Sequence, residues 1–196
     1  VDGSIIAPVT PRAWPSKLLE WINFSKLDGI TIVGNGIIDG QGAAWWRLSQ
    51  YDDESNLPSV RPTAVRFYGS YDVSVQDITI QNSPQCHLKF DSCTSVKVAG
   101  VTISSPANSP NTDGIHLQNS QDVEIHHSSM ACGDDCVSIQ TGCSAVRVHN
   151  INCGPGHGIS IGGLGKDGTK ACVSNVSVYD SSIQDASNGV RIKTWQ

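Results

Sequence analysis

The stretch DVSVQDITIQNS at residues 72–83 is followed by a similar one, SVKVAGVTISSP, at residues 95–106. In both stretches β-branched residues alternate with polar ones, and Gly, Asn, Asp or Ser separate the short runs. A period of two residues over a few positions is typical of a half-buried β-strand. These stretches therefore predict short strands joined by tight turns.

The same alternation recurs along most of the chain. Further copies are GITIVGNGIIDG at 29–40, DVEIHHSSMACGDDCVSIQ at 122–140, AVRVHNINCGPGHGISIG at 145–162 and NVSVYDSSIQDASNGVRIK at 175–193. If Val75, Val98, Ile125, Val148 and Val178 are equivalent, the steps are 23, 27, 23 and 30 residues. A repeat of about 20–50 residues indicates stacked supersecondary units. Leucine-rich repeats share this period, but here Val and Ile take the inward positions.

The fold that remains is all-β, a parallel β-helix in which every coil lies on the one before. No convincing amphipathic helix follows residue 50. Residues 12–27 are less regular, and we expect them to form an N-terminal edge. Because the chain starts without Met and stops inside an expected strand, we expect one β-helix domain over residues 1–196 that is incomplete at both ends.

Charge and hydropathy exclude several partners. The formal net charge is −5 without runs of Lys or Arg, so we expect no nucleic acid partner. No apolar run approaches the roughly 18 residues of a membrane span, and the N-terminus lacks a signal-peptide pattern. We expect no membrane partner.

The chain has seven cysteines and two N-glycosylation sequons, at Asn23 and Asn175. This combination favours an oxidising, secretory compartment over the cytosol. Zinc is the competing use of the cysteines, but Cys132 and Cys136 are not followed by a second close pair at finger-like spacing. The pairing of the cysteines does not follow from their spacing.

Several polar residues recur near the coil period. Asp113 precedes Asp134 and Asp135 by 21 and 22 residues, and His157 follows Asp135 by 22. Residues one coil apart lie about 4.8 Å from each other, so recurring polar residues form one patch. Arg191 comes 34 residues after His157, and we expect it, with Lys193, at a similar phase.

Each of these residues also has a purely structural interpretation. The aspartates could form or cap turns, and the two cations could lie on a solvated strand face. The glycines on both sides of His157 suggest close approach to the backbone. A structural solenoid without chemistry would require all these coincidences, so we expect a site.

Three crowded carboxylates repel one another, so at least one should have a raised pKa and serve as an acid beside ionised bases. Glycoside hydrolysis needs such a pair. Cations one or two coils away would bind an anionic group on the sugar. The residues therefore favour an acidic polysaccharide as the substrate.

At these positions the sequence resembles the polygalacturonases of glycoside hydrolase family 28. The stretches CGPGHGISIGGLGKDG and IDGQGAAWW are similar to those of plant members. The matching motifs, in order, are NTDGIH at 111–116, GDDC at 133–136, GHGISIG at 156–162 and RIK at 191–193. The resemblance covers essentially the whole chain. It implies a single-stranded, right-handed parallel β-helix of the pectin lyase-like type and hydrolysis of α-1,4 bonds in homogalacturonan.

The resemblance also implies a role for each catalytic residue. Asp134 would be the general acid, and Asp113 and Asp135 would activate water on the opposite face of the sugar. His157 would tune or share the proton of the acid. Such an inverting mechanism expects the carboxyls roughly 6.5–9.5 Å apart.

For substrate binding, the resemblance implies that Arg191 and Lys193 bind the galacturonate carboxylate and that Asn111 lines the cleft. It further suggests a Cys136–Cys153 disulfide. It implies no metal and no cofactor, unlike the calcium-dependent pectate lyases. We expect a monomer that is secreted to the cell wall.

Several alternatives stay open. Exo action is the nearest rival of endo action; a non-catalytic pectin-binding β-helix, a pectate or pectin lyase and a rhamnogalacturonan hydrolase are others. The tyrosine of the family lies beyond the RIK motif, where this chain has ended. Because an open end coil exposes strand edges and apolar surface, we expect the isolated chain to be poorly soluble or inactive.

Overall fold

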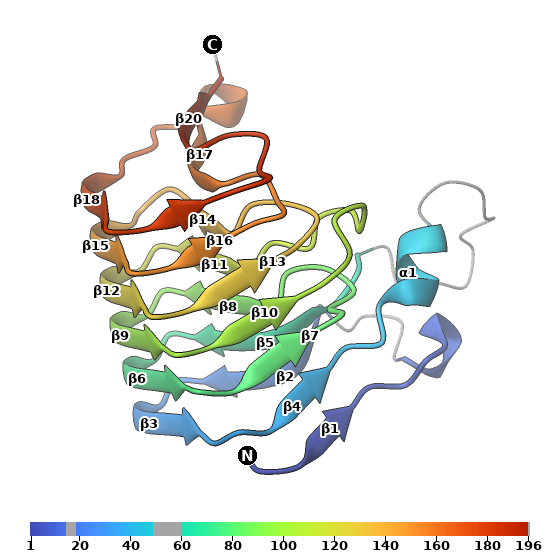
Figure 1. Cartoon of the computed structure of the whole chain (residues 1–196). Coiled ribbons are helices and arrows are strands. Elements are labelled where there is room, and N and C mark those ends of the chain that lie inside the picture. Colours follow the sequence, from blue (N-terminus) through green and yellow to red (C-terminus); the bar gives the residue numbers. More distant parts are fainter. Residues whose placement is uncertain (15–18, 49–59, 196) are drawn as a thin grey trace.

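The chain winds into a solenoid of short strands, with the first coils at one end and the last coils at the other (Figure 1). The computed structural model describes residues 1–14, 19–48 and 60–195. Strands one coil apart pair in parallel and form three sheets, which we name A, B and C. The fold is the predicted right-handed parallel β-helix.

The sheets are defined by their strands. Sheet A consists of β1 (Ser4–Ile6), β4 (Ile37–Asp39), β7 (Thr79–Gln81), β10 (Thr102–Ser104), β13 (Ser129–Ala131), β16 (Asn152–Cys153) and β19 (Ser182–Ile183). Sheet B consists of β2 (Glu20–Ser25), β5 (Thr63–Tyr68), β8 (Leu88–Asp91), β11 (Ile115–Gln118), β14 (Val137–Ile139), β17 (Ile159–Leu164) and β20 (Val190–Thr194). Sheet C consists of β3 (Asp28–Val33), β6 (Tyr71–Gln76), β9 (Thr94–Ala99), β12 (Gln121–His126), β15 (Ser144–His149) and β18 (Ser174–Tyr179).

The register of sheet C is the one that the repeats predict. Val75, Val98, Ile125, Val148 and Val178 are paired in this order from coil to coil. The first four side chains are at most 1% exposed, so the ladder lies in the core. A slip by one residue would turn every side chain of a strand to the opposite face, and burial of this ladder therefore sets the register.

Sheet B lines the core with larger side chains. The rings of Phe24, Phe67 and Phe90 stack on one another, with centroids 5.0 and 5.2 Å apart. Leu117 and Ile139 continue the column in the next two coils. Large side chains in register fill the interior, and offset aromatic stacking adds to the stabilisation from burial.

The turn from sheet C to sheet A repeats one backbone conformation. The residue after each of the last five sheet C strands has a φ between 48° and 67°, at Asp77, Gly100, His127, Asn150 and Asp180. Gly, Asn and Asp adopt this left-handed conformation at low cost, which explains their recurrence at the coil period. His127 is the exception in this column.

At the N-terminal end, β2 is the edge strand of sheet B, as expected for residues 12–27, and short helices accompany it. The irregular residues 12–27 contain the end of a 3-10 helix (Pro11–Ala13) and all of β2, the first strand of sheet B. Helix α1 (Ala43–Leu48) was not predicted, and at six residues it is too short for periodicity to reveal it. Trp45 of α1 packs edge-on against Trp14, with the ring centroids 5.8 Å apart.

Few helices accompany the strands. Besides α1 and Pro11–Ala13, the described residues contain a second 3-10 helix at Lys166–Gly168. None of the helices in this part of the chain is long and apolar enough to cross a membrane.

Candidate active site

The predicted carboxylates and the imidazole lie where the chain passes from sheet A to sheet B. Asp113, Asp135 and His157 each stand two residues before the start of a sheet B strand, namely β11, β14 and β17. Because these strands pair in register, the three residues form a column, with Asp134 beside it. The structure therefore brings together the four residues that the coil period groups.

The two cations reach the site from a different position. The residue that continues the column above His157 is Asn188, two residues before β20, whereas Arg191 lies within that strand. The expectation of a similar phase is thus wrong for the cations. Their long side chains bridge the offset, since Arg191 Nη2 and Lys193 Nζ lie 2.7 and 2.8 Å from the two carboxylate oxygens of Asp135.

Asp135 is buried as a fully paired carboxylate. Its side chain is 2% exposed, and besides the two cations it accepts a hydrogen bond from Ser160 Oγ. Burial raises the pKa of Asp135, but Lys193, Ser160 and Arg191 together outweigh burial and hold this pKa below its usual value. A buried charge requires such partners. Asp135 is therefore an ionised base in a fixed orientation.

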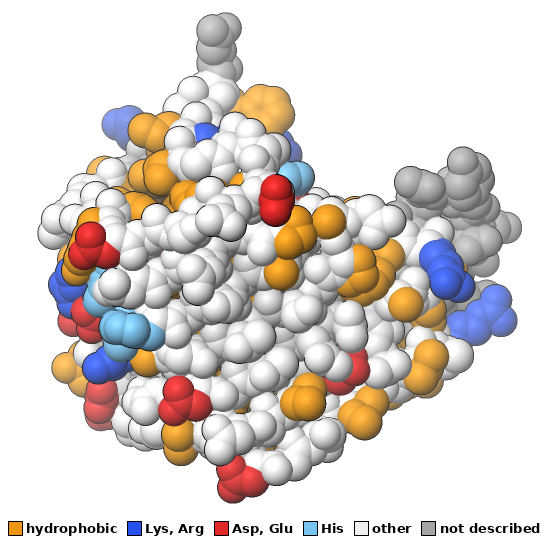
Figure 2. Space-filling view, viewed as in Figure 1, with side chains coloured by type: hydrophobic (Ala, Val, Ile, Leu, Met, Phe, Trp, Pro, Cys, Tyr) orange, Lys and Arg blue, Asp and Glu red, His pale blue; other side chains and the backbone are white. Residues whose placement is uncertain are grey.

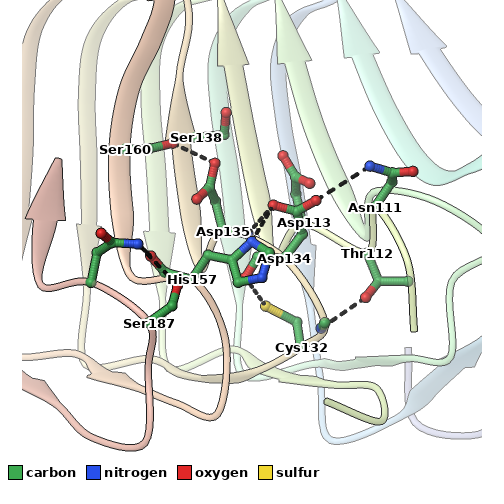
Figure 3. Close-up of polar contacts among 12 residues, drawn as sticks. Asn111, Thr112, Asp113, Cys132, Asp134, Asp135, Ser138, His157, Ser160 and Ser187 are labelled. Carbon is green, nitrogen blue, oxygen red and sulfur yellow. Dashed lines mark hydrogen bonds and ion pairs between the residues drawn. The ribbon is translucent and has the colours of Figure 1, made fainter. Parts of the chain in front are cut away.

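Asp134 is less buried than Asp135 and is accessible from outside. Its side chain is 20% exposed, and Oδ1 lies 3.0 Å from Nδ1 of His157, which is itself 41% exposed. The other oxygen accepts a hydrogen bond from Asn111 Nδ2 at 3.3 Å (Figure 3). The carboxyl can thus exchange a proton with the imidazole and still contact a ligand.

Asp113 differs from both: its carboxyl lies near the other two aspartates and has His116 as its hydrogen-bond partner. Burial raises the pKa of this carboxyl, the charges of Asp134 and Asp135 raise it further, and the hydrogen bond with His116 at 3.4 Å lowers it in part. The crowding of like charges that the sequence predicts therefore acts on Asp113. That Asp134 holds the catalytic proton stays a prediction.

Hydrogen bonds connect the two loops that carry the aspartates. The Gly133 amide donates to Oγ1 of Thr112 at 2.9 Å, which links the Asp113 loop to the Asp134 turn. Below the turn, the thiol of Cys132 donates to the carbonyl oxygen of Asp134 at 3.3 Å. These contacts limit the movement of the carboxylates relative to one another.

A disulfide joins Cys136 to Cys153, with Cα atoms 5.9 Å apart, and confirms the predicted pairing. It fastens the turn that follows the aspartate pair to the next coil. The remaining cysteines are free: Cys86, Cys93, Cys132 and Cys143 are buried, and Cys172 is exposed.

Two further polar residues of the site were not singled out from the sequence. Ser160 hydrogen-bonds to Asp135, and His116 hydrogen-bonds to Asp113. Both lie within motifs used for the resemblance, GHGISIG and NTDGIH. The coil period could have revealed them, because His116 of β11, Ser138 of β14 and Ser160 of β17 occupy matching outward positions and are paired in register.

A metal ion is a further use that the donor atoms allow. Asp134, Asp135 and His157 offer ligand atoms within 4.8 Å of one another. However, Arg191 and Lys193 already neutralise Asp135 and would repel a cation. The donor set therefore fits a metal poorly.

A pocket of about 180 Å³ adjoins Asp113 on the side of the earlier coils. Its lining consists of Thr63, Gln85, Cys86, Lys89, Asn111, Asp113 and His116. Lys89 and His116 are neighbours in register on sheet B, so this pocket adds a cation to the outward face that carries the carboxylates. The site thus extends along the solenoid as a polar groove.

The family model for glycosyl hydrolases family 28 matches residues 2–196. The chain belongs to this family. Among curated relatives, it is 42% identical over 199 residues to a polygalacturonase of Cryptomeria japonica, covering all of this chain and 38% of that protein. It is 44% identical to polygalacturonase-2 of Solanum lycopersicum, covering 90% of this chain and 38% of that protein. The family 28 chain thus spans well under half the length of these relatives.

Solved structures agree with this membership. The polygalacturonase from Erwinia carotovora ssp. carotovora superposes with a TM-score of 0.86 at 27% identity, covering 97% of this chain and 56% of that one. The endo-xylogalacturonan hydrolase from Aspergillus tubingensis gives a TM-score of 0.89 at 26% identity, covering 98% of this chain and 52% of that one. Both likenesses extend over nearly all of the family 28 chain.

Proposed function

We propose that the protein containing this chain hydrolyses the α-1,4 bonds between galacturonic acid residues of pectin. The observation that carries the proposal is the difference in environment between the adjacent residues Asp134 and Asp135. Asp135 is buried and ionised between two cations, whereas Asp134 is accessible and bonded to His157. Polygalacturonases among the relatives support the choice of substrate.

In the proposed reaction Asp134 donates its proton to the glycosidic oxygen as the bond from that oxygen to the anomeric carbon breaks. A water molecule forms the new bond to the anomeric carbon, and Asp113 or Asp135 accepts the proton that the water loses. His157 returns a proton to Asp134 through the 3.0 Å contact. General acid and base catalysis of this kind is worth about 10²–10⁴-fold each.

The cations serve a second purpose in this proposal. Arg191 and Lys193 are 29% and 36% exposed, so their groups also reach the groove. A galacturonate carboxylate carries the charge that complements them. A neutral sugar in the same place would lack this charge pairing, which favours an acidic polysaccharide.

The proposal that the reaction inverts the anomeric configuration rests on the resemblance to the family, not on the distance between the carboxylates. Carboxylate oxygens of Asp134 and Asp135 lie within 4.8 Å of each other, closer than the roughly 6.5–9.5 Å expected when a water molecule separates acid and base. The anomeric form of the first product is the direct measure of this part of the proposal. We further propose endo action, since the groove continues past Asp113 toward the earlier coils.

We also propose that the protein acts outside the cell. Disulfides persist in oxidising compartments, and the Cys136–Cys153 pair supports this location. Both sequon asparagines are exposed, Asn23 on β2 and Asn175 on sheet C, so each offers an accessible glycan site.

The test is product analysis on polygalacturonate, with xylogalacturonan as the second substrate and Asp134→Asn as the inactive control. Endo hydrolysis yields saturated oligomers of mixed length, and proton NMR of the first products identifies the anomer. Monomer alone would mean exo action, and the retained anomer would contradict inversion. Unsaturated products would show a lyase, and preference for xylogalacturonan would overturn the choice of substrate.

A further inference from the structure

A buried histidine, His87, lies one coil before Asp113 and has no part in the chemistry proposed above. It directly precedes β8, and its side chain is completely buried. We propose that His87 is a positioning residue that holds the loop carrying Asn111 and Asp113 in its catalytic geometry. The inference rests on the proposed function, because it assigns Asp113 to the reaction.

Both the main chain and the side chain of His87 bind one acceptor. The carbonyl oxygen of Asp113 accepts the backbone N–H of His87 at 2.9 Å and Nδ1 of its ring at 2.8 Å. Since a carbonyl oxygen only accepts, Nδ1 must carry the proton. Nε2 of the neutral ring is then an acceptor, and Ser105 Oγ donates to it at 2.7 Å.

These two contacts lie at opposite ends of one loop. Ser105 directly follows β10, and Asp113 lies just before β11, so the ring of His87 bridges the start and the end of the connection. Ser105 is also anchored to the next coil, since its amide donates to Ala131 at 2.8 Å. A rigid ring with a donor on one edge and an acceptor on the other sets the width of the loop.

The same contacts connect the catalytic carboxylates. The peptide group between Asp113 and Gly114 is held from below by His87 and from above by Asp135, whose carbonyl oxygen accepts the Gly114 amide at 2.9 Å. The backbone of Asp113 is therefore fixed relative to the backbone of Asp135. A site of this kind tolerates displacement poorly, because a shift of about 1 Å can cost about 100-fold in rate.

The neutral state of the ring suits this role. Burial lowers the pKa of His87 to about 4, although the hydrogen bond to Asp113 opposes the change. Above this pH the ring keeps one proton and one tautomer, so the donor and the acceptor do not exchange places. Imidazole is the one aromatic side chain that offers a nitrogen donor and a nitrogen acceptor on a single rigid ring.

The experiment compares four variants of the protein that contains this chain. His87→Leu removes both contacts, His87→Asn keeps an amide donor near the Nδ1 position, and Ser105→Ala removes only the far contact. Val98→Ala is the control, because Val98 is fully buried on sheet C, far from the site, and its truncation destabilises the fold without touching the loop. Thermal unfolding, kcat, KM and the pKa of the Asp113 carboxyl by carbon-13 NMR are measured for each.

We expect His87→Leu to lower kcat by about 10–100-fold with KM nearly unchanged, because positioning acts mainly on the transition state. His87→Asn should recover most of kcat, and Ser105→Ala should lie between the two. In His87→Leu the pKa of Asp113 should fall toward its ordinary value as the carboxyl turns to solvent.

A purely structural histidine would behave like Val98. Equal kcat in His87→Leu and Val98→Ala, with an unchanged pKa of Asp113, would overturn the proposal. If His87→Leu does not fold, the same decision rests on Ser105→Ala, which must lower kcat and the Asp113 pKa. If the wild type does not hydrolyse polygalacturonate, the proposed function fails, but the NMR titration still decides the role of His87.

Discussion

Two charge clusters on this solenoid have similar partners and very different surroundings. On the sheet B side, Asp135 is 2% exposed and holds Arg191 and Lys193 at 2.7 and 2.8 Å. On sheet C, Arg147 approaches Asp122 and Glu124 at only 3.7 and 3.9 Å, with 31–57% of the three side chains exposed. Figure 2 shows charged and histidine side chains gathered along the edge of the molecule where sheet C lies.

The difference shows what stacking alone can and cannot do. Register places Glu124 beside Arg147 on neighbouring strands, so the solenoid brings charges together wherever the repeat carries them. Exposed pairs of this kind contribute about 0–1 kcal/mol because water and salt screen them. The cluster around Asp135 differs because this carboxylate is buried and each of its oxygens has a partner.

The largest expected effect separates the clusters by activity. Asp134→Asn removes the proposed acid and should lower kcat on polygalacturonate by about 10²–10⁴-fold. Glu124→Gln, the matched change on sheet C, should leave kcat unchanged because its contacts are with His149 and Arg147 on the outer surface. Activity retained in Asp134→Asn would contradict the assignment of the acid.

The next effect separates the clusters by stability. Arg191→Ala leaves the buried Asp135 with one cation fewer and should lower the free energy of unfolding by roughly 1–3 kcal/mol. Arg147→Ala should lower it by less than about 1 kcal/mol. Urea unfolding of both variants measures the difference, and equal losses would show that burial does not distinguish the clusters.

A third prediction concerns pH within the site. The pKa of Asp113 is raised in the folded state, so the folded protein binds the extra proton between the unfolded pKa of about 3.9 and the raised value, and stability falls as the pH rises through this window. Asp113→Asn should therefore raise the melting temperature at pH 7 and have little effect near pH 3.

Asp135→Asn is the control of opposite sign. The pKa of Asp135 is lowered in the folded state, so its ionisation contributes stability above about pH 3.9 that is lost as the pH falls through the folded pKa. This variant should melt lower than the wild type at pH 7. If the two variants shift the melting temperature in the same direction, the contrast between the carboxyls is refuted.

The smallest effect is the salt dependence of sheet C. The hydrogen bond with His149 lowers the pKa of Glu124, and the charge of Arg147 lowers it to a smaller extent. Glu124→Gln should destabilise by less than about 1 kcal/mol at low salt. The loss should shrink in about 1 M salt, where the screening length is about 3 Å. A large loss that is independent of salt would indicate a buried contact instead.

The repeat and the register could be predicted because both are local. Alternation with a period of two fixes which side chains face the core, and the column from Val75 to Val178 is paired as predicted. The same regularity placed Asp113, Asp135 and His157 in one column. The short helix α1 has only six residues, too few to show a helical period, and was not predicted.

The chemistry of each site residue depended on contacts between distant segments. Adjacent in the chain, Asp134 and Asp135 have the same side chain, and no local pattern tells which one is buried. That difference arises because Arg191 and Lys193 reach back from β20 to Asp135 alone. The role of His87 likewise depends on a loop from the next coil.

By itself, then, the sequence determined the parallel β-helix, its register and the column of Asp113, Asp135 and His157, because periodic burial of β-branched side chains repeats in every coil. Only the tertiary structure decided which carboxylate is paired, which is accessible and which has a raised pKa. Desolvation and the reach of long side chains set those properties, and both depend on neighbours that the chain supplies from other coils.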